Sequence, residues 1–461
     1  MRANDSGPGF SERLHTRLDG LRPALGAAFL VAYAWSNFAP ASPSTAAFLV
    51  TGAILYALSL PWVSAFHKGL ALVSFATLGV ALAMGRFDAG AFYEGLPAYF
   101  NVVAVLLVLS VAGYPILAPR YEPQIRALTA ALTRRGAGVR TTSGLLGHVL
   151  GAVLDVGALV IVNAILGRAA PRGRIEALEW AGRGFSFVPL WTNLNVFTAT
   201  TIVLTGVSYP SLLALTLPFA LLGLGGTCLF AQREKGEEAP QEPGIPLDRG
   251  AAAVVLYPVL LVATVAGVNV LSPELALTTV IAVTVAAVVA LIAGLATVVQ
   301  RRAAPLRRLG RETRGSLVAS HAEFVLFGSA GVLVLSLNSL GALAPIGDLL
   351  SALPVALVAP ALMLTLGLGF IVGIHVIPMI LLIDTAFPLD SGPYPALWAA
   401  ALLLGAQSAL LLTPFSNAVT MLARLSGLHP LEVGPRRNWR FGLVVTAAAI
   451  LYLGALSLWF A

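Results

Sequence analysis

Two short polar stretches interrupt long apolar runs of this chain, and their residue types are those that bind small polar solutes. The first, TNLN, begins at Thr192, and the second, TPFSN, begins at Thr413. Each threonine stands 14 residues before a glycine, Gly206 or Gly427, which itself follows a hydroxyl residue. A helix broken inside a membrane exposes backbone groups that protein, water or an ion must satisfy. Such breaks in both halves of a membrane protein indicate a transporter binding site.

The side chains at the two breaks offer neutral donors and acceptors. With backbone N–H groups at half-helix N-termini they suit a carboxylate, and with freed carbonyl oxygens they suit a hard cation such as Na⁺. The alternative is that these side chains only bridge packed helices. The candidates for solute binding are Thr192, Asn193, Asn195, Thr413, Ser416 and Asn417.

Ionisable residues lie in two further apolar segments that precede the breaks. When the two halves are overlaid, Asp155 falls within one residue of His375. Ionisable groups inside a membrane are by default functional hypotheses. We therefore expect ion coupling at both: Asp155 would take a proton or coordinate Na⁺, and His375 would carry a proton or donate to the solute. A purely structural role is the alternative. The glycines Gly144, Gly147 and Gly151 near Asp155 recur at the spacing that allows close helix packing.

Composition places the chain in a bilayer. Of its 461 residues, 58% are hydrophobic and 11% are charged, against about 25% charged residues in soluble domains. The net charge of +7 comes from short basic blocks between apolar runs, so it indicates membrane orientation and no nucleic-acid partner. The single cysteine, Cys228, excludes an intrachain disulfide. No nucleotide-binding or HExxH motif occurs, so we expect no cofactor, no resident metal and no enzymatic activity, with Na⁺ as a candidate coupling ion.

Basic clusters fix a topology for the apolar runs, each of which approaches or exceeds the roughly 20 residues that a crossing takes. With the N-terminus in the cytoplasm, every basic cluster falls inside if Ser143–Gly167 is a re-entrant hairpin and Ile175–Gly206 a broken spanning helix. The alternative is that Ser143–Gly167 spans the membrane and Ile175–Gly206 is the hairpin. This exchange leaves both ends of the half on the same sides of the membrane. Arg120–Arg140 is expected as an amphipathic surface helix. The continuous runs are Pro23–Ala39, Thr45–Phe66, Gly69–Met84, Pro97–Leu117, Tyr209–Phe230, Ala251–Val270, Pro273–Val299, Ser316–Leu340 and Phe441–Phe460.

The same topology makes the two halves inverted repeats. The second half has its own long apolar stretch, Ile346–Phe387, followed by the interrupted run Pro393–Gly427. We therefore predict an all-α polytopic membrane protein with about 11–12 transmembrane helices. Its predicted parts are peripheral N-terminal helices (residues 1–96), a first repeat (97–230), a charged linker with connecting helices (231–315) and a second repeat (316–461).

The two broken-helix segments resemble those of the ion transporter superfamily, which carries citrate, dicarboxylates, arsenite or protons. PLWTNLNVFTATTIVLTG is similar to its first broken-helix motif and LLLTPFSNAVTMLARLSG to its second. The resemblance covers Pro97–Phe230 and Ser316–Phe460, and it implies re-entrant hairpins, a homodimer and a moving repeat region. The chain departs from the family in having DVGA and HVIP where Ser-Asn-Thr tips would stand, which puts the family's cation sites in doubt.

These observations favour a secondary active transporter in the cell inner membrane. It would move a small, carboxylate-like anion, coupled to Na⁺ or H⁺, with the solute and the lipid bilayer as its partners. The alternatives are a non-transporting membrane scaffold and a polytopic membrane enzyme. A scaffold does not explain paired polar breaks, and an enzyme of this kind usually has a large loop with clustered Arg, His or Asp, which the chain lacks.

Overall fold

The chain is helical throughout its described part. A computed structural model describes residues 10–39, 42–116, 122–134, 137–166, 171–233, 249–390 and 394–460. These residues form α-helices and a few short 3₁₀ or π turns, with no strand among them. The predicted all-α polytopic membrane fold is confirmed. Arg168 and most of the predicted charged linker, residues 234–248, lie outside the described residues.

Eight helices of the described residues are long and apolar enough to cross a membrane. The predicted hairpins and broken runs form pairs of shorter helices instead of single long ones. Four of these shorter apolar helices are Val196–Thr205, Val355–Ile371, Val376–Ala386 and Pro395–Ala409. The eight long helices are Pro43–Trp62, Ala65–Ala83, Ala89–Leu109, Tyr209–Gln232, Ala252–Leu271, Leu277–Gln300, His321–Ser339 and Glu432–Phe460.

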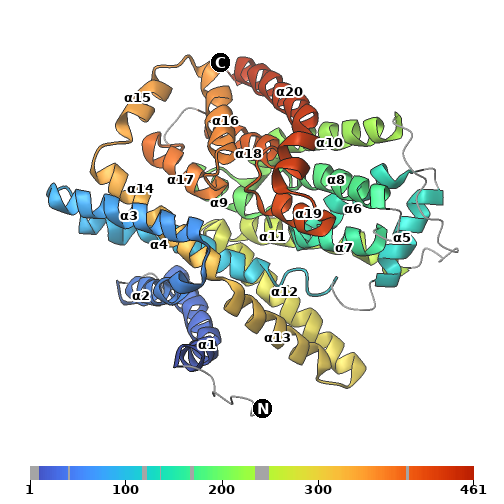
Figure 1. Ribbon diagram of the computed structural model, residues 1–461, viewed down its shortest axis with the longest axis horizontal. Coiled ribbons are helices and arrows are strands. Elements are labelled where there is room, and N and C mark those ends of the chain that lie inside the picture. The colour runs from blue at the N-terminus through green and yellow to red at the C-terminus, as the bar shows by residue number, and fades with distance from the viewer. Residues whose placement is uncertain are drawn as a thin grey trace, which may run out of the picture. The chain divides into compact units, whose positions relative to one another are not determined.

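The helices form two compact units (Figure 1), and the first comprises Met1–Val111 with Val289–Ala342. Its core is aromatic: the Phe29 ring stacks on Phe48 at 5.0 Å and meets Phe324 edge-on at 5.1 Å. The helices of this unit are α1 (Phe10–Phe38), α2 (Ser42–Ser59), α3 (Ala65–Ala83), α4 (Ala89–Leu109), the second part of α12 (Leu277–Gln300), α13 (Ala304–Ala319) and α14 (His321–Ser339).

The second unit comprises Ala112–Val288 with Leu343–Ala461 and carries every predicted site residue. It draws on both predicted repeats, whose boundaries stay a prediction. Besides the first part of α12, its helices are α5 (Glu122–Arg134), α6 (Val139–Leu154), α7 (Gly157–Leu166), α8 (Pro171–Phe185), α9 (Val196–Thr205), α10 (Tyr209–Arg233), α11 (Arg249–Leu271), α15 (Ala344–Ser351), α16 (Val355–Ile371), α17 (Val376–Ala386), α18 (Pro395–Ala409), α19 (Asn417–Ser426) and α20 (Arg437–Phe460).

Glycines let two helices of the second unit approach until their backbones touch. In Figure 1, α6 and α8 run side by side. A Cβ added at Gly184 would overlap the carbonyl oxygen of Gly144, and one added at Gly147 would overlap that of Ala181. The His148 Nδ1–H donates to the Gly184 carbonyl oxygen at 3.0 Å across the same contact. The predicted packing role of the α6 glycines is therefore observed at Gly147 and at Gly151, where an added Cβ would stand 2.6 Å from the Phe185 ring of α8.

Candidate functional site

The first polar stretch is a helix break. After α8 ends at Phe185, a 3₁₀ turn (Val188–Leu190) and then five further residues precede α9. Thr192 Oγ1 accepts from the Leu194 N–H at 3.2 Å. Asn195 caps α9, because its Oδ1 accepts from the Phe197 N–H at 2.9 Å. The polar side chains thus replace backbone partners that the interruption removes.

The second polar stretch repeats this geometry between α18 and α19. Thr413 Oγ1 accepts from the Phe415 N–H at 3.2 Å, as Thr192 does from the second residue after it. Ser416 then caps α19, because its Oγ accepts from the Val419 N–H at 3.1 Å. Pro414 has no N–H, so it cannot continue the hydrogen-bond ladder of α18. The two stretches that look alike in sequence also have the same local conformation.

The equal spacing from threonine to glycine also has a structural meaning. Both α9 and α19 are ten residues long and end at a left-handed glycine, Gly206 with φ 63° and Gly427 with φ 74°. Only glycine adopts this conformation without steric cost, and it stops a helix by turning the chain away. The equal spacing from threonine to glycine therefore reflects two half-helices of the same length.

The capping role predicts different effects for two neighbouring substitutions. Ser416→Ala should lower the free energy of unfolding by about 1 kcal/mol, because a cap is lost. Asn417→Ala should leave it unchanged, because Asn417 is exposed and makes no side-chain hydrogen bond within the described part of the chain. Thermal unfolding of the purified protein, followed by tryptophan fluorescence, measures both. Equal losses for the two variants would contradict the observed cap.

The tip of the second hairpin meets both breaks. This hairpin consists of α16 and α17, joined by a turn in which Gly373 has φ 103° and His375 caps α17. The His375 ring lies 6.0 Å from the Phe197 ring at the first break. A Cβ added at Gly373 would stand 3.2 Å from the Phe415 ring at the second break. His375 thus lies where the predicted site residues converge.

Asp155 occupies the tip of the first hairpin, formed by α6 and α7. Its φ of 48° is uncommon for a residue with a side chain. Unusual backbone conformations of this kind cluster at functional sites. The side chain is exposed. Asp155 and His375, which the sequence overlay aligns, therefore lie at equivalent places, the tips of the two hairpins. An ion-coupling role for either residue stays a prediction.

The first break buries its polar residues more deeply than the second. Thr192 and Asn193 are fully buried at the first break, where Asn195 is half-buried. Thr413 and Ser416 are buried at the second break, but Asn417 is exposed. The Asn193 Nδ2–H donates to the Val262 carbonyl oxygen of α11 at 3.3 Å, whereas its Oδ1 is buried with no partner among the described residues.

Gln407 precedes the second break by roughly two turns, so the sequence also offers it as an extension of the site. This α18 residue is 2% exposed, and neither polar atom of its amide has a hydrogen-bond partner in the part of the chain that is described. Helix α9 packs against α18, and its buried Thr200 and Thr201 hydroxyls likewise lack partners there. An unsatisfied buried polar group costs about 1–3 kcal/mol. Such a group in a native structure needs an explanation, for which a bound ligand is one candidate.

The direction of Gln407 follows from its neighbours on α18. Gly405 faces α16, since a Cβ added there would lie 2.5 Å from the Met363 carbonyl oxygen, and Ala409 also contacts α16 at Gly367. Gln407, two residues from each, points to the opposite side of α18. The sequence signal for Gln407 is its place, beside Ser408, roughly two turns before the second break.

Arg183 lies near the first break in sequence, but its side chain contacts α20 and a tryptophan of α8. Its Nε–H donates to Asn438 Oδ1 at 3.0 Å, and its guanidinium lies 4.6 Å from the centre of the Trp180 ring. Arg437 pairs with Glu179 at 2.6 Å. These contacts tie α8 to the start of α20. Among the described residues, no three His, Cys, Asp or Glu side chains are grouped so that they could hold a metal ion.

Comparisons with known proteins identify no family for this chain. No protein-family model matches the chain, and no curated protein matches it. Among solved structures, the chain is similar to the YdaH transporter of Alcanivorax borkumensis, a protein of unusual topology. The two share 15% identity, with 85% of this chain and 98% of that chain covered, at a TM-score of 0.48. At these values neither residues nor activity carry over to this chain.

Proposed function

We propose that the protein is a secondary active transporter that moves a small, carboxylate-like anion across the cytoplasmic membrane, coupled to Na⁺ or H⁺. The observation that carries the proposal is the convergence of both helix breaks on one hairpin tip, through Phe197 at His375 and Phe415 at Gly373. Breaks placed in this way bring polar groups from both halves of a chain to one point inside a membrane.

The half-helix N-termini would hold the carboxylate. The first turns of α9 and α19 carry backbone N–H groups and the positive ends of two helix dipoles, which favour an anion. The unpartnered amide oxygen of Asn193 and the amide of Gln407 would form hydrogen bonds with polar groups of the solute other than its carboxylate. A site made of neutral groups binds a carboxylate without a buried arginine. This agrees with the structure, in which the nearby Arg183 donates its hydrogen bond to Asn438 instead.

The coupling ion would act at the hairpin tips. Na⁺ binds oxygen ligands, and broken helices offer carbonyl oxygens at their C-terminal ends. Proton coupling would instead use Asp155 or His375, the ionisable residues of the two tips. The second break is open at Phe415 (59% exposed) and at the exposed Asn417, whereas Thr192 and Asn193 are buried. In this conformation the solute would therefore enter from the side of the second break.

Uptake into proteoliposomes tests the proposal. We expect a radiolabelled carboxylate to accumulate under an inward Na⁺ gradient or a pH gradient, and to stop accumulating when the gradient is dissipated. Asn195→Ala should lower uptake at least tenfold in protein that remains folded and loses only about 1 kcal/mol of stability from the missing cap. Asn338→Ala, at an exposed position of the first unit, is the matched control and should keep full uptake. Loss of stability in Asn195→Ala in proportion to its loss of uptake would favour the scaffold instead.

A further inference from the structure

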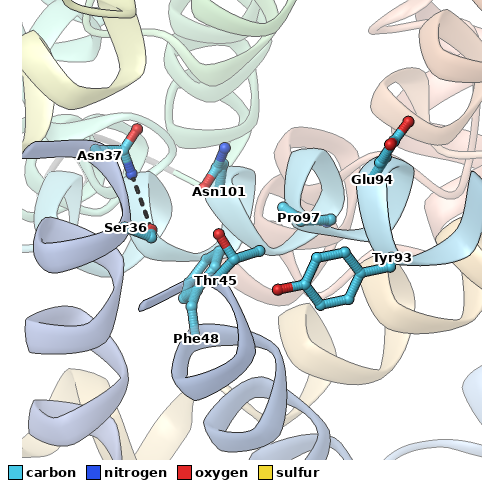
Figure 2. A pocket seen from close by; sticks show the side chains of 8 residues that line it. All are labelled: Ser36, Asn37, Thr45, Phe48, Tyr93, Glu94, Pro97 and Asn101. Atoms are coloured by element: carbon cyan, nitrogen blue, oxygen red, sulfur yellow. Dashed lines mark hydrogen bonds between the residues drawn. The ribbon is translucent and has the colours of Figure 1, made fainter. Parts of the chain in front are cut away.

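The first unit contains a pocket that the proposed transport site does not use. It has a volume of about 330 Å³ and lies between α1, α2 and α4 (Figure 2). Its α4 wall is one helix face, because Tyr93, Glu94, Pro97 and Asn101 follow each other at helical spacing. The opposite walls come from the end of α1 and the start of α2.

The apolar floor of the pocket is held by the core of the unit. Phe48 lies beneath the pocket and is itself fully buried. Its ring stacks on Phe29 at 5.0 Å and meets the Phe100 ring edge-on at 6.3 Å. Because aromatic clusters of this kind fix ring orientation, the floor keeps its shape without a ligand.

The polar side of the pocket is negative. Ser36 and Asn37 donate to the Tyr33 carbonyl oxygen at 2.9 and 2.8 Å, so they stay close to α1. Glu94 is the one ionisable carboxylate of the lining, and no Arg, Lys or His lines the pocket with it. In the described residues neither Glu94 nor Asn101 has a side-chain partner. The pocket therefore offers an anion, an amide and aromatic surface to a ligand that brings its own positive charge.

We propose that this pocket binds the ammonium group of a small primary amine. Glu94 would pair with the ammonium, Asn101 would accept one of its hydrogens, and the half-exposed Tyr93 ring would cover the short carbon chain. Charge-assisted hydrogen bonds and cation–π contacts are the interactions that recognise such a group. A free amine and the ethanolamine headgroup of a phospholipid share this chemistry. The α1 end, the α2 start and the α4 start all fall on the predicted outer side of the membrane, where either source is present.

Binding of ethanolamine and butylamine to the detergent-purified protein tests this inference. We expect saturable binding by calorimetry for the amines and none for ethylene glycol or butanol, which lack the charge. Glu94→Gln should weaken binding at least tenfold, since it removes the charge and keeps the shape. Asn101→Leu should weaken it as well, by a change that leaves the carboxylate in place. Glu274→Gln, which changes an exposed carboxylate of the second unit, is the matched control and should bind as the original chain does.

A second arm distinguishes the two sources of the amine. The protein is placed in nanodiscs of phosphatidylethanolamine or of phosphatidylcholine, and its melting temperature is compared. A higher melting temperature in phosphatidylethanolamine that disappears in Glu94→Gln would identify the lipid headgroup, even if soluble amines do not bind. Binding that Glu94→Gln leaves unchanged, or no amine effect in either arm, would overturn the proposal. The transport assay is unaffected by that outcome, because the pocket residues belong to the first unit and the proposed solute site to the second.

Discussion

Replacing Gln407 with leucine is expected to abolish uptake while leaving the protein as stable as before, or more so. The Gln407 amide is buried without a hydrogen-bond partner in the described structure. Its removal would relieve about 1–3 kcal/mol of desolvation cost, because leucine has a similar volume and no polar atom. If the amide serves a solute, the same change should lower uptake at least tenfold, since a solute group would then be left unpaired.

Uptake and melting temperature measured on the same preparation test this expectation. Gln300→Leu is the matched control, because Gln300 is exposed at the end of α12 and should tolerate the change in both assays. A Gln407→Leu protein that melts lower and transports less in proportion would show that Gln407 holds helices together. Unchanged uptake would remove Gln407 from the site altogether.

Replacing Gly184 with valine is expected to unfold the packed pair α6 and α8. The new Cβ would overlap the carbonyl oxygen of Gly144, and a backbone carbonyl cannot rotate away as a side chain can. The helices would have to separate, which would also break the hydrogen bond from His148 to the Gly184 carbonyl oxygen. Overpacking costs typically 1–3 kcal/mol and occasionally more, and we expect a loss of about 3 kcal/mol or more, because the clash is with backbone.

Fluorescence-detected gel filtration and thermal unfolding measure this loss. Gly226→Val on α10 is the matched control, because a Cβ added there meets no other atom within 4 Å. The control should run as a single folded peak with an unchanged melting temperature, whereas Gly184→Val should aggregate or melt far lower. A Gly184→Val protein as stable as the control would mean that α6 and α8 are not in backbone contact.

The sequence predicts the local features of the site well, because short-range chemistry determines them. Pro414 stops a helix by lacking an N–H, and Gly427 stops the next by a left-handed turn. The Ser and Asn caps follow from the residues that prefer such positions. The hairpin tip at Asp155 also lies where the sequence indicates it. All of these signals act within a few residues of the place they mark.

Features that depend on packing between distant segments could not be predicted in the same way. Nothing near His375 in the sequence indicates that its ring meets Phe197, 178 residues away. The sequence places Gln407 just before the second break, but its burial and its missing hydrogen-bond partners depend on how α18 packs.

Thermal unfolding in the presence of candidate solutes tests the central claim most directly, namely that the paired breaks form a solute site. Mono-, di- and tricarboxylates and oxyanions would be added to the purified protein and to Gln407→Leu, each in Na⁺ and in K⁺ buffer. A ligand at a hundred times its Kd adds about 2.7 kcal/mol of stability. We predict that one carboxylate stabilises the original chain and not the variant, in Na⁺ alone if Na⁺ is coupled and in both salts if H⁺ is. Equal stabilisation of both proteins would remove Gln407 from the site, and no stabilisation by any carboxylate would contradict the claim.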